Sequence, residues 1–198
     1  MLAAAILAAG ESRRMGSPKA LQTIHGKTFL GHLLQATRDP RIGLTLIVLG
    51  AAANEIRAKI DPGEASIVIN SDWQKGQLSS IHAAIRNLPK GKTEGLILCP
   101  VDHPLVSQNL VASLIERFES SAKKITVPCF EGRRGHPVIF HASLYDELLA
   151  ASYEIGARQV VKAHPGAIEE VSTTEEGVIL NLDDPESLRK AAATPPPN

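Results

Sequence analysis

A segment near the start of the chain, residues 8–19 (AAGESRRMGSPK), combines small residues with cationic side chains such as Arg14 and Lys19. Glycine and alanine allow backbone N–H groups to approach phosphate oxygens closely, and fixed positive charges neutralise those oxygens. The apolar run that precedes it, residues 2–7, is typical of a buried strand. The pattern therefore predicts a loop after a first strand that binds a polyphosphate, although composition alone is equally consistent with an exposed, solvated turn.

The two commonest nucleotide-binding motifs do not account for this segment. Gly-Lys-Thr occurs at residues 26–28 and 91–93, as at the end of a P-loop, but Leu21 and Arg86 occupy the positions of the leading glycine. The chain also lacks the G-x-G-x-x-G fingerprint of dinucleotide-binding proteins. If residues 8–19 bind phosphate, they do so as a loop of another kind.

Polar side chains that could bind a ligand or take part in a reaction recur further along the chain. Asp102 follows the apolar run 96–99, and the ends of such strands are where open α/β sheets bind ligands. Arg133 and Arg134 precede a glycine and could bind a phosphate in a bidentate manner or keep a hairpin loop in solvent. The serine pair 79–80 could contact a ligand or cap a helix.

The elements that must position these residues alternate along the chain. Continuous apolar runs rich in Ile, Val and Leu predict strands at 3–8, 44–49, 66–69, 95–99, 125–128, 137–140, 168–171 and 178–180. Amphipathic stretches predict helices at 28–38, 53–60, 77–88, 108–119, 142–150, 157–163 and 185–192. Ser107 and the pair Asp184-Pro185 are good helix-start signals. The alternation predicts an α/β fold with a mostly parallel sheet and helices on both faces.

Length and composition narrow the function classes. The 198 residues favour one domain, which we expect over residues 1–193, followed by a proline-rich, frayed tail at 194–198. The 21 Lys and Arg balance the 21 Asp and Glu, so a nucleic-acid binder acting through a bulk positive field is disfavoured. Cys99 and Cys129 lack zinc-site or disulfide spacing, and each is expected as a small buried strand residue. No stretch predicts a membrane helix or signal peptide, so we expect a cytoplasmic protein.

Residues 7–19 resemble the signature L-A-A-G-x-S-x-R-M-G-x-P-K of the MobA-like nucleotidyltransferases. Within that family they look most like the molybdenum cofactor cytidylyltransferases, because Ala9 and Pro18 stand where the guanylyltransferase branch usually carries glycine and aspartate. The resemblance implies a Rossmann-like nucleotidyltransferase fold. It also implies that the nucleotide is bound by Leu7, Ala8, Ala9, Gly10, Arg14 and Lys19.

Two further segments resemble parts of the family that surround the nucleotide. Residues 70–80 (NSDWQKGQLSS) are similar to N-P-x-W-x-x-G-x-x-S-S, which implies that Gly76 and Ser80 lie against the base. Residues 100–104 (PVDHP) are similar to a Gly-Asp-Gln-Pro run whose aspartate binds Mg²⁺, which implies that Asp102 is a metal ligand. Here His103 replaces the glutamine; a lone histidine is more often structural, so it either packs or contacts the acceptor, and we assign it to the acceptor side.

The later segments complete the resemblance, which extends to about residue 188. Residues 133–138 (RRGHPV) are similar to R-x-G-H-P-V on the acceptor side of the cleft, which implies acceptor binding by Arg134, Gly135 and His136. Residues 181–188 (NLDDPESL) are similar to D-I-D-T-P-E-D-L, which implies that Asp183 is the second Mg²⁺ ligand. Residues 154–158 match a Gly-Ala-Arg segment that we place only at the rim.

The activity implied by the resemblance is transfer of CMP from CTP to molybdopterin, with Mg²⁺ as cofactor and Arg14, Lys19 and Asp102 as catalytic residues. Three alternatives stay open at this point. One is guanylyl transfer to the same cofactor, and another is cytidylyl transfer to a sugar or polyol phosphate. The third is a non-catalytic carrier or insertion chaperone for the cofactor. Molybdenum hydroxylases are the expected client enzymes, and neither nucleic acid nor membrane is an expected partner.

Overall fold

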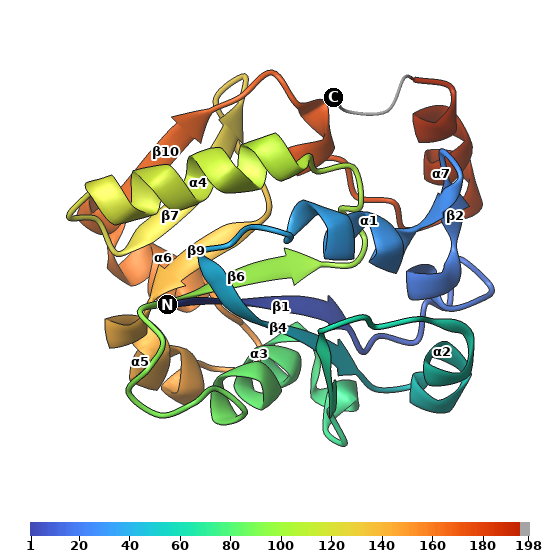
Figure 1. Cartoon of the computed structure of the whole chain (residues 1–198), viewed down its shortest axis with the longest axis horizontal. Helices are drawn as coiled ribbons and strands as arrows, with labels where there is room; N and C mark the ends of the chain where they lie inside the picture. The colour runs from blue at the N-terminus through green and yellow to red at the C-terminus, as the bar shows by residue number, and fades with distance from the viewer. Residues whose placement is uncertain (195–198) are drawn as a thin grey trace.

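The computed structural model describes residues 1–194. One eight-stranded sheet runs through the described part of the chain in the order β10-β7-β9-β6-β1-β4-β5, with β8 paired to β7 (Figure 1). The strands are β1 Leu2–Ala8, β4 Ile42–Leu49, β5 Ser66–Ile69, β6 Gly95–Pro100, β7 Ile125–Phe130, β8 Arg133–Arg134, β9 Val138–His141 and β10 Ile168–Ser172. β1 is parallel to both β4 and β6, β4 is parallel to β5, and β7 is parallel to β10. Only β8 and β9 run antiparallel to their neighbours in this sheet.

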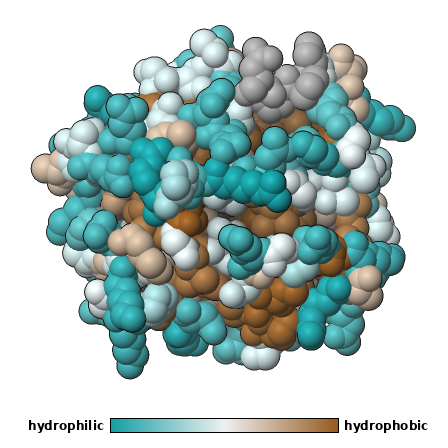
Figure 2. Space-filling model, viewed as in Figure 1, coloured by the Kyte–Doolittle hydropathy of each residue, from teal (hydrophilic) through white to brown (hydrophobic). Residues whose placement is uncertain are grey.

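Helices cover both faces of the sheet, and Figure 1 shows α4 and α1 on one side with α3 and α5 on the other. The first face is covered by α1 Phe29–Ala36, α2 Ala53–Lys59, α4 Gln108–Ser120 and α7 Pro185–Ala192. The second is covered by α3 Gln77–Arg86, α5 Tyr145–Ala150 and α6 Arg158–Ala163. In the space-filling view, which has the orientation of Figure 1, polar side chains dominate the side that faces the viewer, with apolar patches between them in its lower half (Figure 2).

The central strand β1 is buried along its whole length, which explains its unbroken apolar sequence. Ala4 and Ile6 belong to the core on the α1/α4 side, whereas Ala3, Ala5 and Leu7 belong to the core on the α3 side. Side chains of a strand alternate between its two faces, so a strand between two helical layers must be apolar at every position. The sequence thereby places the end of β1, and the loop after it, at the carboxyl edge of the sheet among its central strands.

The predicted α/β fold is confirmed, and seven of the eight predicted strands and all seven predicted helices are present. Ser107 and Asp184 act as N-caps, through bonds from the backbone N–H groups of Leu110 and Ser187. The predicted strand 178–180 is wrong. A 3-10 turn, Glu176–Val178, occupies its start, and the Val178 carbonyl accepts a bond from the His136 N–H rather than from a sheet neighbour.

Three short strands escaped prediction. β2 Thr23–Ile24 and β3 Lys27–Thr28 form a separate hairpin whose turn has positive φ at His25 and Gly26. β8 is also only two residues long. Apolar alternation needs a longer run to give a signal, so such strands are invisible to a pattern.

The two cysteines lie in strands of the sheet, Cys99 in β6 and Cys129 in β7. Burial of Cys99 at the end of β6 raises the pKa of its thiol to about 12, and Cys129 is half-buried; both are free. No helix among residues 1–194 combines the length and apolar character needed to cross a membrane. Of the predicted tail 194–198, only Thr194 is among the described residues; 195–198 lie outside them. The domain bounds 1–193 stay a prediction.

Candidate functional site

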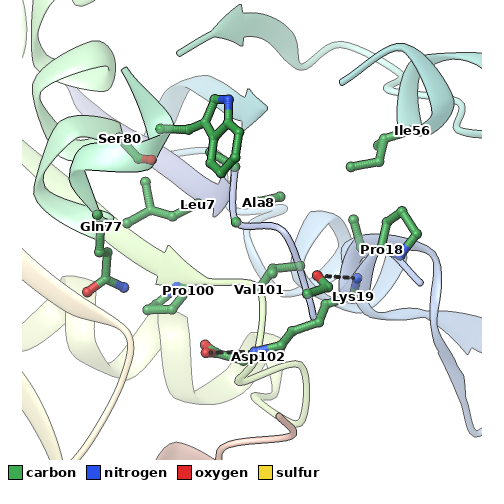
Figure 3. Close-up of a pocket in the computed structure, with 16 residues that line it drawn as sticks. Leu7, Ala8, Pro18, Lys19, Ile56, Gln77, Ser80, Pro100, Val101 and Asp102 are labelled. Atoms are coloured by element: carbon green, nitrogen blue, oxygen red, sulfur yellow. Dashed lines mark hydrogen bonds and ion pairs between the residues drawn. The ribbon is translucent and has the colours of Figure 1, made fainter. Parts of the chain in front are cut away.

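A pocket of about 200 Å³ opens where the parallel strands β1 and β6 end, at the carboxyl edge of the sheet (Figure 3). This is the edge at which open α/β sheets bind ligands, because the loops that follow parallel strands meet there. The pocket is lined by Leu7, Ala8, Ala9, Gly10, Ser12, Pro18, Lys19, Ala20, Ile56, Trp73, Gly76, Gln77, Ser80, Pro100, Val101 and Asp102.

The structure brings most of the predicted nucleotide-binding residues together around this pocket. Seven of them line it, namely Leu7, Ala8, Ala9, Gly10, Lys19, Gly76 and Ser80, as does the predicted metal ligand Asp102. Arg14 does not line the pocket and is bonded to Asp183. Their roles in binding and catalysis remain predictions.

Sequence reasoning missed several lining residues. Trp73 carried a signal, because it matches the tryptophan of the segment 70–80, yet no role was assigned to it. Pro18 and Val101 adjoin predicted residues. Ile56 lies on α2 and reaches the pocket only through the tertiary fold, so no local pattern could have found it.

Lys19 lies between two carboxylates at one end of the pocket. Its Nζ is 3.4 Å from Oδ2 of Asp102 and also contacts Oδ1 of Asp183 (Figure 3 shows the first of these contacts). Arg14 Nη2 donates to the other oxygen of Asp183 at 2.6 Å. Residues from the loop after β1, the end of β6 and the segment before α7 therefore meet at one point, although they are 83 and 164 positions apart along the chain.

Electrostatics at this point favour the ionised form of Asp183. Burial by itself would raise the pKa of Asp183, but its contacts with Lys19 and Arg14 outweigh burial and hold that pKa below its usual value. The Ser12 hydroxyl accepts a bond from the Lys19 backbone N–H at 2.9 Å, which fixes the start of the lysine's 3-10 turn. The result is a cluster of two negative and two positive side chains at one end of the pocket.

The donor set of this cluster fits a hard divalent cation that is shared with a ligand. Two carboxylates already surround one cationic group, the Lys19 ammonium, so the same oxygens could surround a metal ion. Mg²⁺ is usually held by one or two carboxylates together with substrate phosphates and water. Among residues 1–194 no cluster of three or more His, Cys, Asp or Glu side chains could hold a metal by itself. Asp102 and Asp183 therefore suit a metal that is completed by phosphate oxygens.

The buried Asn70 organises the opposite end of the pocket. Its Nδ2 donates to the hydroxyls of Ser79 and Ser80 at 2.8 and 3.1 Å. Ser79 in turn donates to the Gly76 carbonyl at 2.7 Å. Neither serine caps α3, whose N-cap is Gly76 with no side-chain bond, so the capping alternative is wrong. Ser80 instead presents a fixed hydroxyl to the pocket (Figure 3).

Two histidines predicted on the acceptor side pack together beyond Asp102. The rings of His103 and His136 are 4.8 Å apart between centroids, and His103 Nε2 lies 4.0 Å from Asp102 Oδ1. Burial lowers the pKa of both rings, that of His136 to about 3, so both are neutral at physiological pH. The Nδ1 atom of each ring is buried without a partner in the described structure. Neither residue lines the pocket, and their contact with an acceptor remains a prediction.

The other two residues predicted on the acceptor side have structural partners. Arg134 donates from Nε to Glu170 at 2.7 Å and forms an ion pair with it, so its guanidinium is engaged on β10. A Cβ atom on Gly135 would lie 2.3 Å from the carbonyl oxygen of Val178. Close approach of two backbone segments explains this glycine without a ligand.

We expect the substitution Gly135→Ala to destabilise the fold. The added methyl group must displace the Val178 backbone, and overpacking of this kind typically costs about 1–3 kcal/mol. Urea denaturation of the variant checks this, with Gly166→Ala as control because a Cβ there meets no atom within 4 Å. Equal stability of the two variants would contradict the packing argument.

Comparison with known proteins gives relatives along nearly the whole chain. The molybdenum cofactor guanylyltransferase of Shewanella sp. strain ANA-3 is 28% identical over 196 residues, 96% of this chain and 94% of that protein. The nicotine blue oxidoreductase of Paenarthrobacter nicotinovorans is 27% identical, covering 92% of each chain. Among solved structures, Rv0371c of Mycobacterium tuberculosis superposes with a TM-score of 0.83 at 26% identity, over 98% of this chain and 97% of that one.

A second structure of Rv0371c, described as a complex with manganese, superposes with a TM-score of 0.78 at 25% identity, covering 98% of this chain and 99% of that one. The family model for the MobA-like NTP transferase domain matches residues 4–168. This range includes the loop after β1, the Asn70 network and Asp102. The chain belongs to the MobA-like NTP transferase family.

Proposed function

We propose that this nucleotidyltransferase transfers CMP from CTP to a phosphate group of molybdopterin and releases pyrophosphate. The observation that carries the proposal is the position of Lys19, held between Asp102 and Asp183 at the end of the pocket. Transfer between two polyanions needs positive charge and alignment more than it needs an acid and a base. A purely binding protein would have no need of both carboxylates.

In the proposed reaction, an oxygen of the acceptor phosphate attacks the α-phosphorus of CTP. A new P–O bond forms there as the bond to the bridging oxygen of pyrophosphate breaks. Lys19 and Arg14 would neutralise the triphosphate, together with the backbone N–H groups of Ala9 and Gly10. Asp102 and Asp183 would hold Mg²⁺, whose charge offsets the charge that the phosphates carry in the transition state. No general base is required, because the attacking phosphate is already ionised.

Recognition of the base would fall to the Asn70 end of the pocket. Because Ser80 Oγ accepts from Asn70 Nδ2, its own hydroxyl hydrogen is free to be donated to a ligand. Cytosine presents acceptor atoms next to its amino group, so a donor at a fixed position can distinguish it from bases that present donors there. Gly76 lies beside Ser80 and would allow the base to approach the backbone closely.

Support for the acceptor and for the metal comes from relatives. The Shewanella relative is named for guanylyl transfer to the molybdenum cofactor, and the manganese complex of Rv0371c is consistent with a divalent cation. The choice of CTP over GTP rests on the resemblance of Ala9 and Pro18 to the cytidylyltransferase branch. The name of the Paenarthrobacter relative concerns an oxidation–reduction reaction, so family membership leaves the reaction to be tested. Molybdenum hydroxylases would receive the product, and we propose that the protein acts in the cytoplasm.

Calorimetric titration with CTP and with GTP, each with and without Mg²⁺, tests the proposal. We expect tight binding of CTP that depends on the metal, and weak binding of GTP. Preference for GTP would instead indicate guanylyl transfer to the same cofactor. Pyrophosphate release from CTP with molybdopterin, compared with a panel of sugar and polyol phosphates, identifies the acceptor. Binding of CTP without release of pyrophosphate in the presence of any acceptor would favour the carrier or chaperone alternative.

A further inference from the structure

The carboxylate of Asp183 lies on a segment without regular structure, since no helix or strand covers residues 179–184. Backbone hydrogen bonds within a helix or a sheet therefore cannot fix its position. The same segment contains two of the three residues, 179 and 180, of the stretch that the apolar pattern predicted as a strand. Its position must come from contacts with other parts of the chain.

Two contacts attach this segment to the loop that follows β6 and carries Asp102. The backbone N–H of Leu182 donates to the Asp102 carbonyl at 2.8 Å, and the Leu182 side chain is buried. Further back, the backbone of Gly177 lies against Leu105, where a Cβ atom would come within 1.7 Å of the carbonyl oxygen. The segment thus crosses directly over the loop that bears the other carboxylate.

A third contact fastens the start of this segment to the first turn of α4. The Glu175 carboxylate accepts from the backbone N–H of Ser107 at 3.0 Å and from the Ser107 hydroxyl. That hydroxyl also accepts from the N–H of Leu110 at 3.0 Å, so it caps the helix and holds Glu175 at once. A carboxylate is favoured at this end of a helix by the helix dipole.

We propose that Ser107 and Glu175 are positioning residues that set the separation between Asp102 and Asp183. The inference rests on the proposed function. Asp102 is five positions before Ser107, and Asp183 is eight positions after Glu175. The chain segments that carry the two carboxylates are therefore both attached to the start of α4. This 13-residue helix is rigid because its apolar side is buried in the core. Loss of the contact would leave the residues intact but allow the segment with Asp183 to move away from Asp102.

The test compares the Mn²⁺ affinity of the variants Ser107→Ala and Glu175→Ala with that of the wild type. Electron paramagnetic resonance measures this affinity in the presence of saturating CTP. Loss of groups that orient metal ligands typically weakens metal binding about 10- to 100-fold, and we expect a change in this range. CTP binding measured without metal should stay as in the wild type. Glu175→Gln should recover much of the metal affinity, because its carboxamide oxygen still accepts from the Ser107 N–H. Glu176→Ala, at the exposed neighbouring position, is the matched control.

The outcomes separate this inference from its premise. If Glu175→Ala and Ser107→Ala lower the melting temperature but bind Mn²⁺ as the wild type does, the contact is only a helix cap and the inference is overturned. Weakening by Glu176→Ala of the same size would also overturn it. If the wild type and Glu176→Ala bind no Mn²⁺ with CTP, the proposed function itself fails.

Discussion

We expect turnover to fall by about 10³-fold or more in Asp102→Asn, because the variant loses one of the two charged ligands proposed for the metal. A loss of roughly 4 kcal/mol in transition-state stabilisation corresponds to this factor. The fold should survive. The Asp102 side chain is partly exposed and contacts Lys19, whereas the bond from the Leu182 N–H goes to its backbone carbonyl, which asparagine keeps. Pyrophosphate release at saturating CTP and acceptor measures the change, and circular dichroism checks the fold.

Asp184→Asn is the control for this experiment. Asp184 is adjacent to Asp183 but caps α7 by accepting from the Ser187 N–H at 2.8 Å, and asparagine is an equally good N-cap. Its turnover should stay near that of the wild type. Near-normal, Mg²⁺-dependent turnover in Asp102→Asn would remove Asp102 from the mechanism. A comparable loss in both variants would point to general sensitivity of this region to charge.

The sheet could be predicted from the sequence where a strand is buried on both faces. β1, β4 and β6 have continuous apolar sequences because helices pack on both sides of them. The order of the strands could not be predicted in the same way. The antiparallel β9, inserted between β6 and β7, has the same apolar character as its parallel neighbours, and nothing local marks its direction.

The error at residues 178–180 has a specific physical cause. Val178 is fully buried and the two residues after it are half-buried, so the stretch has the composition of an interior strand; Leu182, just beyond it, is also buried. Their burial comes from packing across the loop after β6, where Gly177 permits close contact with Leu105. Apolar composition reports burial, whereas a strand also requires a free neighbour in the sheet, and composition carries no information on that point.

The candidate site was predictable where motif and topology coincide, and less so elsewhere. Residues of the loop after β1 meet Asp102 because both follow parallel neighbouring strands that end at one edge. The distant Asp183 was assigned only through family resemblance, and the structure places it beside Lys19. The engagement of Arg134 by Glu170 could not be foreseen, because that pairing depends on β10 lying beside β7.

The substitution Lys19→Met should have opposite effects on the two ligands. The methionine keeps the apolar part of a side chain that is largely buried but removes the charge proposed to meet the triphosphate. A hydrogen bond to a charged group contributes about 1.5–3 kcal/mol, so CTP affinity should fall roughly 10- to 100-fold. Binding of Mn²⁺ without nucleotide should become tighter, because the ammonium no longer competes for Asp102 and Asp183. Separate titrations with CTP and with Mn²⁺ measure the two effects.

Stability against pH gives an independent measurement on the same variant. Although burial opposes it, the contacts of Asp183 with Lys19 and Arg14 keep its pKa below the usual value in the folded protein. Ionised Asp183 therefore stabilises the fold above about pH 4, and this contribution is lost as the pH falls through the lowered pKa. Lys19→Met lacks most of it, so its melting temperature should differ most from that of the wild type at neutral pH and converge with it in acid.

Lys27→Met is the matched control, since Lys27 is an exposed lysine of the same region whose ammonium contacts Gln35 rather than a carboxylate. It removes an equal charge from the protein without touching the cluster around Asp183. Parallel losses of CTP affinity in the two variants would mean that overall charge, rather than the position of Lys19, attracts the nucleotide. Unchanged Mn²⁺ binding in Lys19→Met would mean that the ammonium and the metal do not share the same carboxylate oxygens. That result would move the metal site away from the space between Asp102 and Asp183.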